Sequence, residues 1–209
     1  MRDILRVVRY FSVFSYAPTP DDIYTFLSKK VSKRELEANL QNLTKKGVLK
    51  RVSLEIQGKK RAKYTLGEYG IKEAQMSNLK AQNYEMRYKT SQRKIAGVRF
   101  FIKMLSVFPQ IKLVGFSGSC AMGNAKEDDD VDFFIISARG RMWTARFVAN
   151  AIAFLLGIKR KRGIRKAKDK VCLNLIFDEE ALEIPKFKHN EYVGHEVLQM
   201  KPIFNKNHI

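Results

Sequence analysis

The sequence has few acidic residues for the number of basic residues it carries. Against 40 lysines and arginines there are only 21 aspartates and glutamates, so the formal net charge at pH 7 is +19. Such an excess predicts attraction to a polyanion, with a strong dependence on salt. Nucleic acid and anionic lipid both qualify. The sequence pattern shows no basic amphipathic helix with a wide apolar face, so we expect RNA or DNA as the partner and no membrane.

Long apolar runs, a leader sequence and a cysteine framework are also absent. The longest apolar candidate, residues 147–158, is shorter than the ~18 residues of a membrane span. The N-terminus begins an amphipathic pattern instead of a signal peptide. The two cysteines, Cys120 and Cys172, do not have metal-binding spacing. We therefore expect reduced cysteines and a cytoplasmic protein, built from one large or two small domains.

Three helices and a hairpin are predicted in the first third of the chain. Apolar residues recur at helical spacing in the first helix. Thr19 is the expected N-cap of the second, and Ser32 that of the third, which Gly47 ends. A basic turn joins the two strands that follow. The predicted elements span residues 2–16, 20–28, 32–46, 48–56 and 62–66.

This order of elements resembles a winged helix-turn-helix domain over residues 1–67. In DNA-binding members of that class the third helix enters the major groove and the hairpin can contact the backbone. The resemblance implies nucleic-acid contacts for Lys33, Arg34, Asn39, Asn42 and Lys46 of the third helix and for Lys59, Lys60, Arg61 and Lys63 of the hairpin. A winged helix that binds protein or dimerises, with merely solvated lysines, remains the alternative.

The most informative stretch is residues 111–137, where two apolar runs enclose a glycine–serine pair and a group of acids. Each apolar run has the length of a buried strand. Asp130 and Asp132 alternate with Val131 at the start of the second run, so both carboxylates point to the same face. Paired carboxylates on a buried strand need a neutralising cation. Carboxylate oxygens suit Mg²⁺ (or Mn²⁺).

Three other interpretations of this stretch explain it less well. Gly118 and Gly123 have the spacing of a P-loop, but the Lys and Ser/Thr that must follow are missing. An EF-hand loop opening at Asp128 lacks its obligatory glycine and its final glutamate. A solvated acidic loop does not explain Asp130 and Asp132, which lie against the apolar run.

Ser117-Gly118-Ser119, followed by Asp130-Val131-Asp132-Phe133, resembles the signature of the polymerase-β-like nucleotidyltransferase superfamily. The resemblance implies an NTP substrate and a catalytic metal pair bound by the two aspartates. It also implies that Gly118 and Ser119 open a short helix whose N-terminus holds the nucleotide phosphates.

The third carboxylate that active members usually carry on a later strand has no obvious counterpart here. The strand predicted at residues 171–177 puts Lys170, Cys172, Asn174 and Ile176 on one face. Asn174 occupies the expected catalytic position. An amide cannot act as a base and ligates metal weakly, so this departure bears directly on activity.

Basic residues surround the second half of this region. The helix predicted at residues 141–156 has apolar residues at helical spacing, including Trp143, Phe147 and Phe154, and Arg141 and Arg146 could reach a triphosphate. Residues 159–170 contain eight basic residues and one acid, which indicates an interaction surface or a solvated loop. The nucleic-acid contacts we assign there are Lys159, Arg160, Lys161 and Arg162.

The sequence thus predicts an α+β protein with a winged helix-like domain (1–67), a helical linker (68–92) and a small mixed-sheet nucleotidyltransferase-like domain flanked by helices (93–209). The leading hypothesis is a metal-dependent nucleotidyltransferase that moves a nucleoside monophosphate from an NTP to a hydroxyl acceptor on nucleic acid. One alternative is a winged-helix regulator with a catalytically degenerate transferase domain. Another is an antitoxin-like transferase that modifies a protein hydroxyl. The sequence leaves the oligomeric state open.

Overall fold

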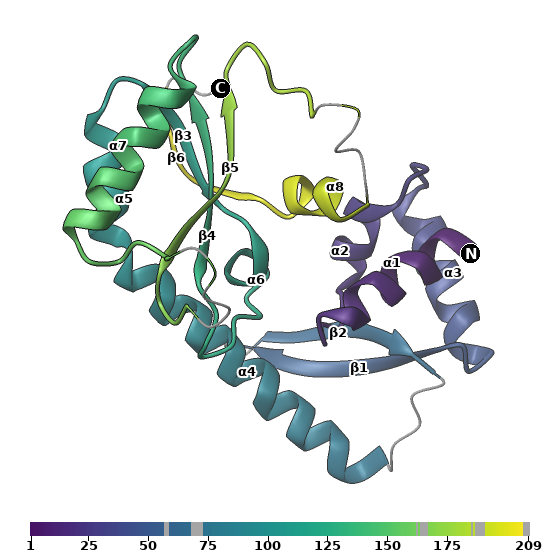
Figure 1. Cartoon of the computed structure of the whole chain (residues 1–209). Coiled ribbons are helices and arrows are strands. Elements are labelled where there is room, and N and C mark those ends of the chain that lie inside the picture. Colours follow the sequence, from purple (N-terminus) through teal and green to yellow (C-terminus); the bar gives the residue numbers. More distant parts are fainter. Residues whose placement is uncertain are drawn as a thin grey trace. The chain divides into compact units, whose positions relative to one another are not determined.

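A computed structural model of the chain describes residues 1–56, 59–67, 73–161, 163, 167–184, 186 and 191–206. Over these residues it contains eight α-helices, a two-stranded antiparallel sheet and a four-stranded mixed sheet (Figure 1). The predicted α+β class is therefore confirmed. The chain divides into two compact units, Met1–Glu85 and Met86–Ile209.

The first unit consists of three helices followed by a hairpin. Its helices are α1 (Arg2–Val13), α2 (Pro20–Phe26) and α3 (Lys33–Lys45). Strand β1 (Leu49–Ile56) pairs with β2 (Lys59–Leu66) in antiparallel register from end to end. The apolar side chains that form its core include Ile4, Val7, Val8, Phe11, Ile23, Leu36, Leu40, Leu43 and Leu49.

Capping interactions fix the predicted starts of α2 and α3. Thr19 accepts a hydrogen bond from the Asp22 backbone N–H, and the Asp22 carboxylate accepts one from the Thr19 backbone N–H. These two hydrogen bonds form a reciprocal capping box, and Pro20 occupies the first helical position inside it. At α3 the Ser32 hydroxyl accepts from the Glu35 backbone N–H. Both predicted N-caps are confirmed.

Lys63, expected to contact nucleic acid from the hairpin, is instead buried. The residue is only 3% exposed. Its ammonium lies 4.1 Å from the ring centre of Tyr16 and 4.9 Å from that of Tyr84, a residue of α4 (Glu73–Gly97). A cation held against aromatic faces and away from water contributes to stability. Lys63 is therefore part of the fold of this unit, and the prediction that it contacts a nucleic-acid backbone is wrong.

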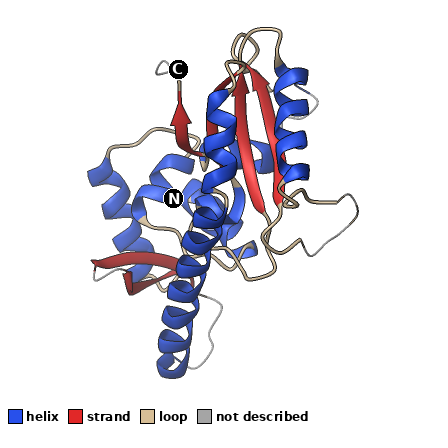
Figure 2. Cartoon of the chain, turned by 90° about the vertical axis from the view of Figure 1, so that its left-hand side faces the viewer, coloured by secondary structure: helices blue, strands red, loops and turns tan. Residues whose placement is uncertain are grey.

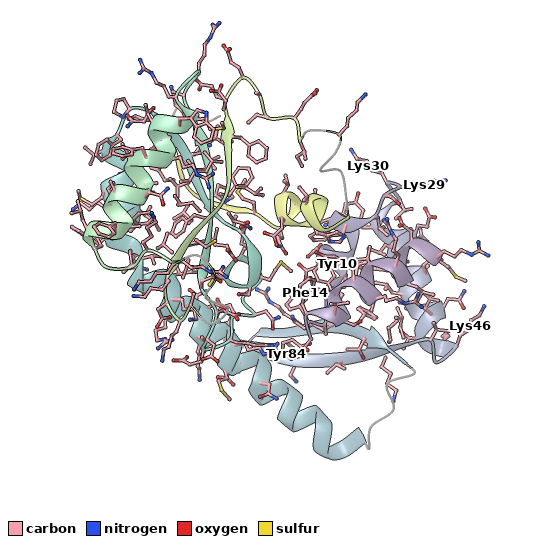
Figure 3. The ribbon with its side chains drawn as sticks, in the orientation of Figure 1. Tyr10, Phe14, Lys29, Lys30, Lys46 and Tyr84 are labelled. Carbon is pink, nitrogen blue, oxygen red and sulfur yellow. The ribbon has the colours of Figure 1, made fainter. Side chains whose placement is uncertain are left out.

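The other basic residues assigned to nucleic acid in this unit lie at its surface where the structure describes their side chains. Figure 3 labels Lys46 at the end of α3, which was predicted, and two further lysines, Lys29 and Lys30 just after α2; all three are exposed. The side chain of Lys59 lies outside the described residues. Of the residues predicted to contact nucleic acid, Asn39 is half-buried, and the exposed ones are Lys33, Arg34, Asn42, Lys46, Lys60 and Arg61.

The second unit is a sheet in the strand order β5-β4-β3-β6. Strands β3 (Ile111–Phe116) and β4 (Val131–Ser137) form its antiparallel centre. Strand β5 (Val171–Asp178) runs parallel to β4. Strand β6 (Lys201–Asn205), which sequence reasoning missed, pairs with β3 at the other edge.

Helices cover both faces of this sheet. Helices α5 (Arg99–Val107) and α7 (Met142–Leu155) contact one face through the larger apolar core, and Figure 2 looks onto that face. Helix α8 (Glu191–Leu198) packs Val197 against a smaller apolar cluster on the opposite face. The short helix α6 (Gly118–Ala121) follows β3, where the glycine–serine pair led us to expect it.

The large apolar residues of α7 point the opposite way from what helical periodicity suggests. Trp143, Phe147 and Phe154 are between 72% and 74% exposed. The side chains that face the sheet are mostly small: Ala145, Ala149, Ile152 and Ala153. The periodicity located the helix correctly, but the buried stripe is the alanine stripe, because small side chains let the helix lie against the sheet.

Replacing Lys63 with alanine should destabilise the first unit by about 2 kcal/mol, because it removes a desolvated cation–π contact and buried methylene groups. Urea unfolding followed by circular dichroism measures the change. The exposed Lys60→Ala change in the same strand is the matched control and should alter stability by less than about 0.5 kcal/mol. Equal effects of the two changes would contradict a structural role for Lys63.

Candidate metal centre

Asp130 and Asp132 lie together at the start of β4, as strand alternation requires. Val131, Phe133 and Ile135 of this strand are fully buried in the core beneath α5 and α7. Asp130 and Asp132, which alternate with Val131 and Phe133, project from the opposite face. One carboxylate oxygen from each, together with the sulfur of Cys172, forms a group in which all three ligand atoms lie within 4.8 Å of one another.

Cys172 joins this group through the register of the sheet. It pairs directly with Asp132 in the parallel β4–β5 ladder. Burial first, and then the nearby carboxylates, raise the pKa of the thiol to about 11, and the thiol shares a hydrogen bond with Asp132. The predicted face of the strand contained this residue, but a cysteine without metal-binding spacing drew no functional assignment.

A register shift in β5 falls at Asn174 and changes the faces of the residues that follow it. The pairing passes from Phe133 with Leu173 to Phe134 with Leu175, so Asn174 is an extra residue in a bulge. Asn174 donates to Ser117 Oγ on the carboxylate face. Ile176, predicted to share that face, instead packs in the larger core on the other side. The bulge breaks the alternation on which that prediction depended.

Arg160 provides the positive charge nearest to the two carboxylates. The segment after α7 runs beside β5, with the Arg160 backbone N–H donating to the carbonyl of Val171. This places the guanidinium where it donates to Asp130 Oδ2 and lies 3.8 Å from Cys172 Sγ. The charge of Asp130 raises the pKa of Arg160. Arg160 was predicted to contact nucleic acid; in this structure it is the counter-ion of Asp130.

The remaining residues predicted in this basic segment have different surroundings. Lys159 and Lys161 are exposed on either side of Arg160. Arg162 lies outside the described residues. The two lysines flank the counter-ion of Asp130, so the segment borders the carboxylate group.

The acidic loop before β4 is held in place by Lys94 of α4. This lysine is 2% exposed. Its ammonium donates to the carbonyl oxygens of Glu127 and Asp129 at 2.9 and 2.8 Å and to the Asp169 carboxylate at 2.7 Å. The loop that delivers Asp130 to the site is therefore anchored to a buried cation and is not simply solvated.

Glu196 on α8 is the carboxylate that sequence reasoning missed. It is 6% exposed and accepts hydrogen bonds from Asn174 Nδ2 at 2.9 Å and Gln199 Nε2 at 2.8 Å. It is also hydrogen-bonded to the side chain of Ser117 and the backbone of Gly118. The only available signal was an acid among the apolar residues of a helix far along the chain, and nothing in the sequence placed that helix beside β4.

Three carboxylates thus share one partly desolvated region. Burial first, then the negative charges of Asp130 and Glu196, raise the pKa of Asp132 to about 7. Burial also raises the pKa of Glu196. A raised carboxylate pKa means that the folded site favours a proton or another cation at that position. This is the electrostatic condition that a bound divalent cation would satisfy.

Gly118 makes the turn beside Asp132 possible. Its backbone has φ of +60°, a conformation in which a side chain is strained. A Cβ atom added there would lie 2.5 Å from Asp132 Oδ2. The carboxylate and the turn that opens α6 are therefore in direct contact, with the half-buried Ser119 next in the chain.

The structure does not bring the two predicted nucleotide-binding arginines to the carboxylates. Arg141 follows the far end of β4, and at about 3.3 Å per residue that end of the strand is roughly 16 Å from Asp132. Arg146 is exposed on α7, which covers the other face of the sheet.

Comparisons of the chain with protein-family models, with curated protein sequences and with solved structures gave no match. Its function therefore has to be argued from the residues of this site.

Asp132→Asn should stabilise the protein at neutral pH when no divalent cation is present. The folded-state pKa of about 7 lies above the ordinary aspartate pKa of 3.8, so the unfolded chain releases its proton first and stability falls between about pH 4 and about pH 7. The variant escapes this loss, which reaches about 4 kcal/mol at most. Thermal unfolding across that range measures the difference between variant and parent.

The exposed Asp128→Asn change has the same change in charge and should leave the pH profile parallel to that of the parent. Adding Mg²⁺ or Mn²⁺ should stabilise the parent and not the Asp132 variant. An Asp132→Asn protein that is less stable than the parent near neutral pH would contradict this account of the site.

Proposed function

We propose that the protein is a metal-dependent nucleotidyltransferase that moves a nucleoside monophosphate from an NTP to a hydroxyl acceptor on nucleic acid. The observation that carries the proposal is the contact between Asp132 and the Gly118 turn. It joins the two halves of the signature, the glycine–serine turn and the paired aspartates, in one site. A solvated acidic loop would have no reason to make this contact.

The residues around Asp130 and Asp132 fit a divalent cation. Their oxygens are hard ligands, the pKa of Asp132 is raised, and a guanidinium already occupies one carboxylate. Mg²⁺ or Mn²⁺ bound there would neutralise the carboxylates and polarise the phosphate oxygens of the substrate. Asp130 and Asp132 would hold the ion, with Cys172 as a neighbouring group whose raised pKa keeps it a neutral thiol.

Arg160 has a second role in this proposal. When a metal neutralises Asp130, the guanidinium is no longer needed as its counter-ion. Its planar fork suits phosphate oxygens, and the exposed Lys159 and Lys161 beside it extend the positive surface. The segment would then bind the triphosphate or the backbone of the acceptor strand.

Glu196 supports an anion-binding role for the turn at Ser117 and Gly118. Donors from this turn already bind a carboxylate, so the turn presents hydrogen-bond donors to an anion. Phosphate oxygens bound there would have to displace Glu196. Asn174 donates to both Ser117 and Glu196, so its role is to position groups around the turn and not to act as a base.

The second candidate function is a nucleic-acid-binding regulator with an inactive transferase domain. Asn174 favours it, because it stands at the expected catalytic position on β5, and Glu196 is engaged with four other residues. In this alternative the first unit would bind nucleic acid without any nucleotide transfer.

The transfer reaction itself provides the direct test. Each labelled NTP, with Mg²⁺ or Mn²⁺, is incubated with the protein and with RNA, single-stranded DNA or protein acceptors. Transfer should occur to a nucleic acid, and Asp130→Asn and Asp132→Asn should each reduce it by roughly a hundredfold or more, because the metal is no longer held. Asp128→Asn should retain activity. Undiminished transfer by both site variants would falsify the assignment, and labelling of protein alone would favour the protein-modifying alternative.

Glu196→Gln should tighten the binding of a fluorescent ATP analogue with Mn²⁺ by about fivefold, because it removes a negative charge that competes with the phosphates. Fluorescence anisotropy gives the affinity, and the exposed Glu183→Gln is the control for net charge. Weaker nucleotide binding in the Glu196 variant would contradict this, because it would show that the Glu196 carboxylate contributes to nucleotide binding instead of competing with the phosphates for the turn.

A further inference from the structure

The outer face of α5 and α7 exposes an unusual amount of apolar surface. On α7, Trp143, Phe147 and Phe154 recur at helical spacing, and Leu155 beside them is 81% exposed. Phe100 and Val107 on the neighbouring α5 are 59% and 72% exposed. We call these six residues the α5–α7 apolar face. Contiguous exposed apolar surface of this kind marks an interaction site.

The sequence around the apolar face is free of negative charge. No aspartate or glutamate lies between Glu85 and Glu127 or between Asp132 and Asp169, and these two intervals contain both helices. The exposed basic residues on and beside the helices are Arg99, Lys103, Arg139, Arg141, Arg146 and Lys159. The face is therefore apolar with basic side chains on and around it, of which Arg139 forms an ion pair with Glu180 at 3.0 Å.

We propose that the α5–α7 apolar face binds the surface of an anionic lipid membrane, a partner that the sequence pattern alone did not lead us to expect. Aromatic and aliphatic side chains flanked by lysine and arginine are the combination that holds a protein at the boundary between headgroups and acyl chains. The basic side chains would lie among the anionic headgroups, and Trp143 at the start of α7 would sit at the interface. None of the described helices is long and apolar enough to cross a membrane, so the attachment is peripheral.

Two other occupants fit the face less well. A second copy of the chain would bring two mainly basic surfaces together, which is unfavourable. Single-stranded nucleic acid would satisfy the arginines and could stack on Trp143 and Phe147. Nucleic acid would leave the exposure of Val107 and Leu155 unexplained. These aliphatic side chains cannot stack on a base, but they can contact lipid acyl chains.

The only tryptophan of the chain, Trp143, lies in the face and reports directly on its occupancy. The full chain is mixed with vesicles of phosphatidylcholine and phosphatidylglycerol at about two to one, or of phosphatidylcholine alone. With the anionic vesicles, tryptophan emission should shift to shorter wavelength and the protein should float with the lipid. Neutral vesicles should bind it at least about tenfold more weakly, and added salt should weaken binding to the anionic ones.

Phe147→Ala combined with Phe154→Ala keeps the reporter and should weaken binding to anionic vesicles by at least about tenfold. Val13→Ala combined with Phe14→Ala removes exposed apolar surface from the first unit and should have no effect. Arg99→Gln combined with Lys103→Gln should reduce the preference for anionic lipid. Because both residues of the aromatic pair are mostly exposed, these variants should fold, which circular dichroism can verify.

The absence of an emission shift with anionic vesicles would overturn the proposal. So would a shift that appears only as protein concentration rises and coincides with dimerisation in light scattering, which would identify a second copy as the occupant. A shift produced by single-stranded RNA and abolished in the Phe147 and Phe154 variant, with no response to vesicles, would identify nucleic acid instead. None of these measurements depends on transfer activity.

Discussion

The mutual repulsion of Asp130 and Asp132 at the start of β4 is the constraint to which much of the second unit responds. Two carboxylates within a few ångströms and partly removed from water are unstable unless neighbouring groups compensate. Lys94 anchors the loop that delivers Asp130, the Arg160 guanidinium neutralises that carboxylate, and Asp132 retains a raised pKa. Gly118 has no side chain to keep the turn away from Asp132. Two cations and a glycine turn thus meet at this point from three separate parts of the sequence.

The groups that satisfy the site are compatible with the proposed ligand. A cation from the protein, Arg160, binds Asp130, and an anion from the protein, Glu196, binds the turn at Gly118. A metal–nucleotide complex carries a cation and an anion together. It could replace Arg160 at Asp130 with the metal and Glu196 at the turn with the phosphates, and the net charge of the buried site would then change little. This exchange explains how a polar cluster can be stable without ligand and still be poised to bind one. Asn174 would have a role in this exchange without being a base. It donates hydrogen bonds to both Ser117 and Glu196, so it holds these two groups in place around the turn.

Much of the fold could be predicted because local patterns determine it. Thr19 and Ser32 cap their helices through neighbours three residues away, and strand alternation is enough to put Asp130 and Asp132 on one face. The failures have non-local causes. Glu196 reaches the site only because α8 packs across the sheet. The alternation in β5 fails at a bulge. Lys63 is buried because rings from two other elements enclose it. Arg141 looked close to the site in sequence, but a whole strand separates it from Asp132.

The two faces of the sheet explain how the proposed roles can coexist. The carboxylates project on the face that carries α8, whereas the α5–α7 apolar face lies beyond the opposite one. A lipid surface bound through α5 and α7 would therefore leave the approach to Asp130 and Asp132 unobstructed by the membrane. The charge distribution agrees with this division. Five of the 21 acidic residues lie between Glu127 and Asp132, so the sign of the charge reverses locally at the proposed cation site, while both helices of the apolar face lie in stretches without acids. An excess of positive charge can then serve two polyanions, one on each side of the same sheet.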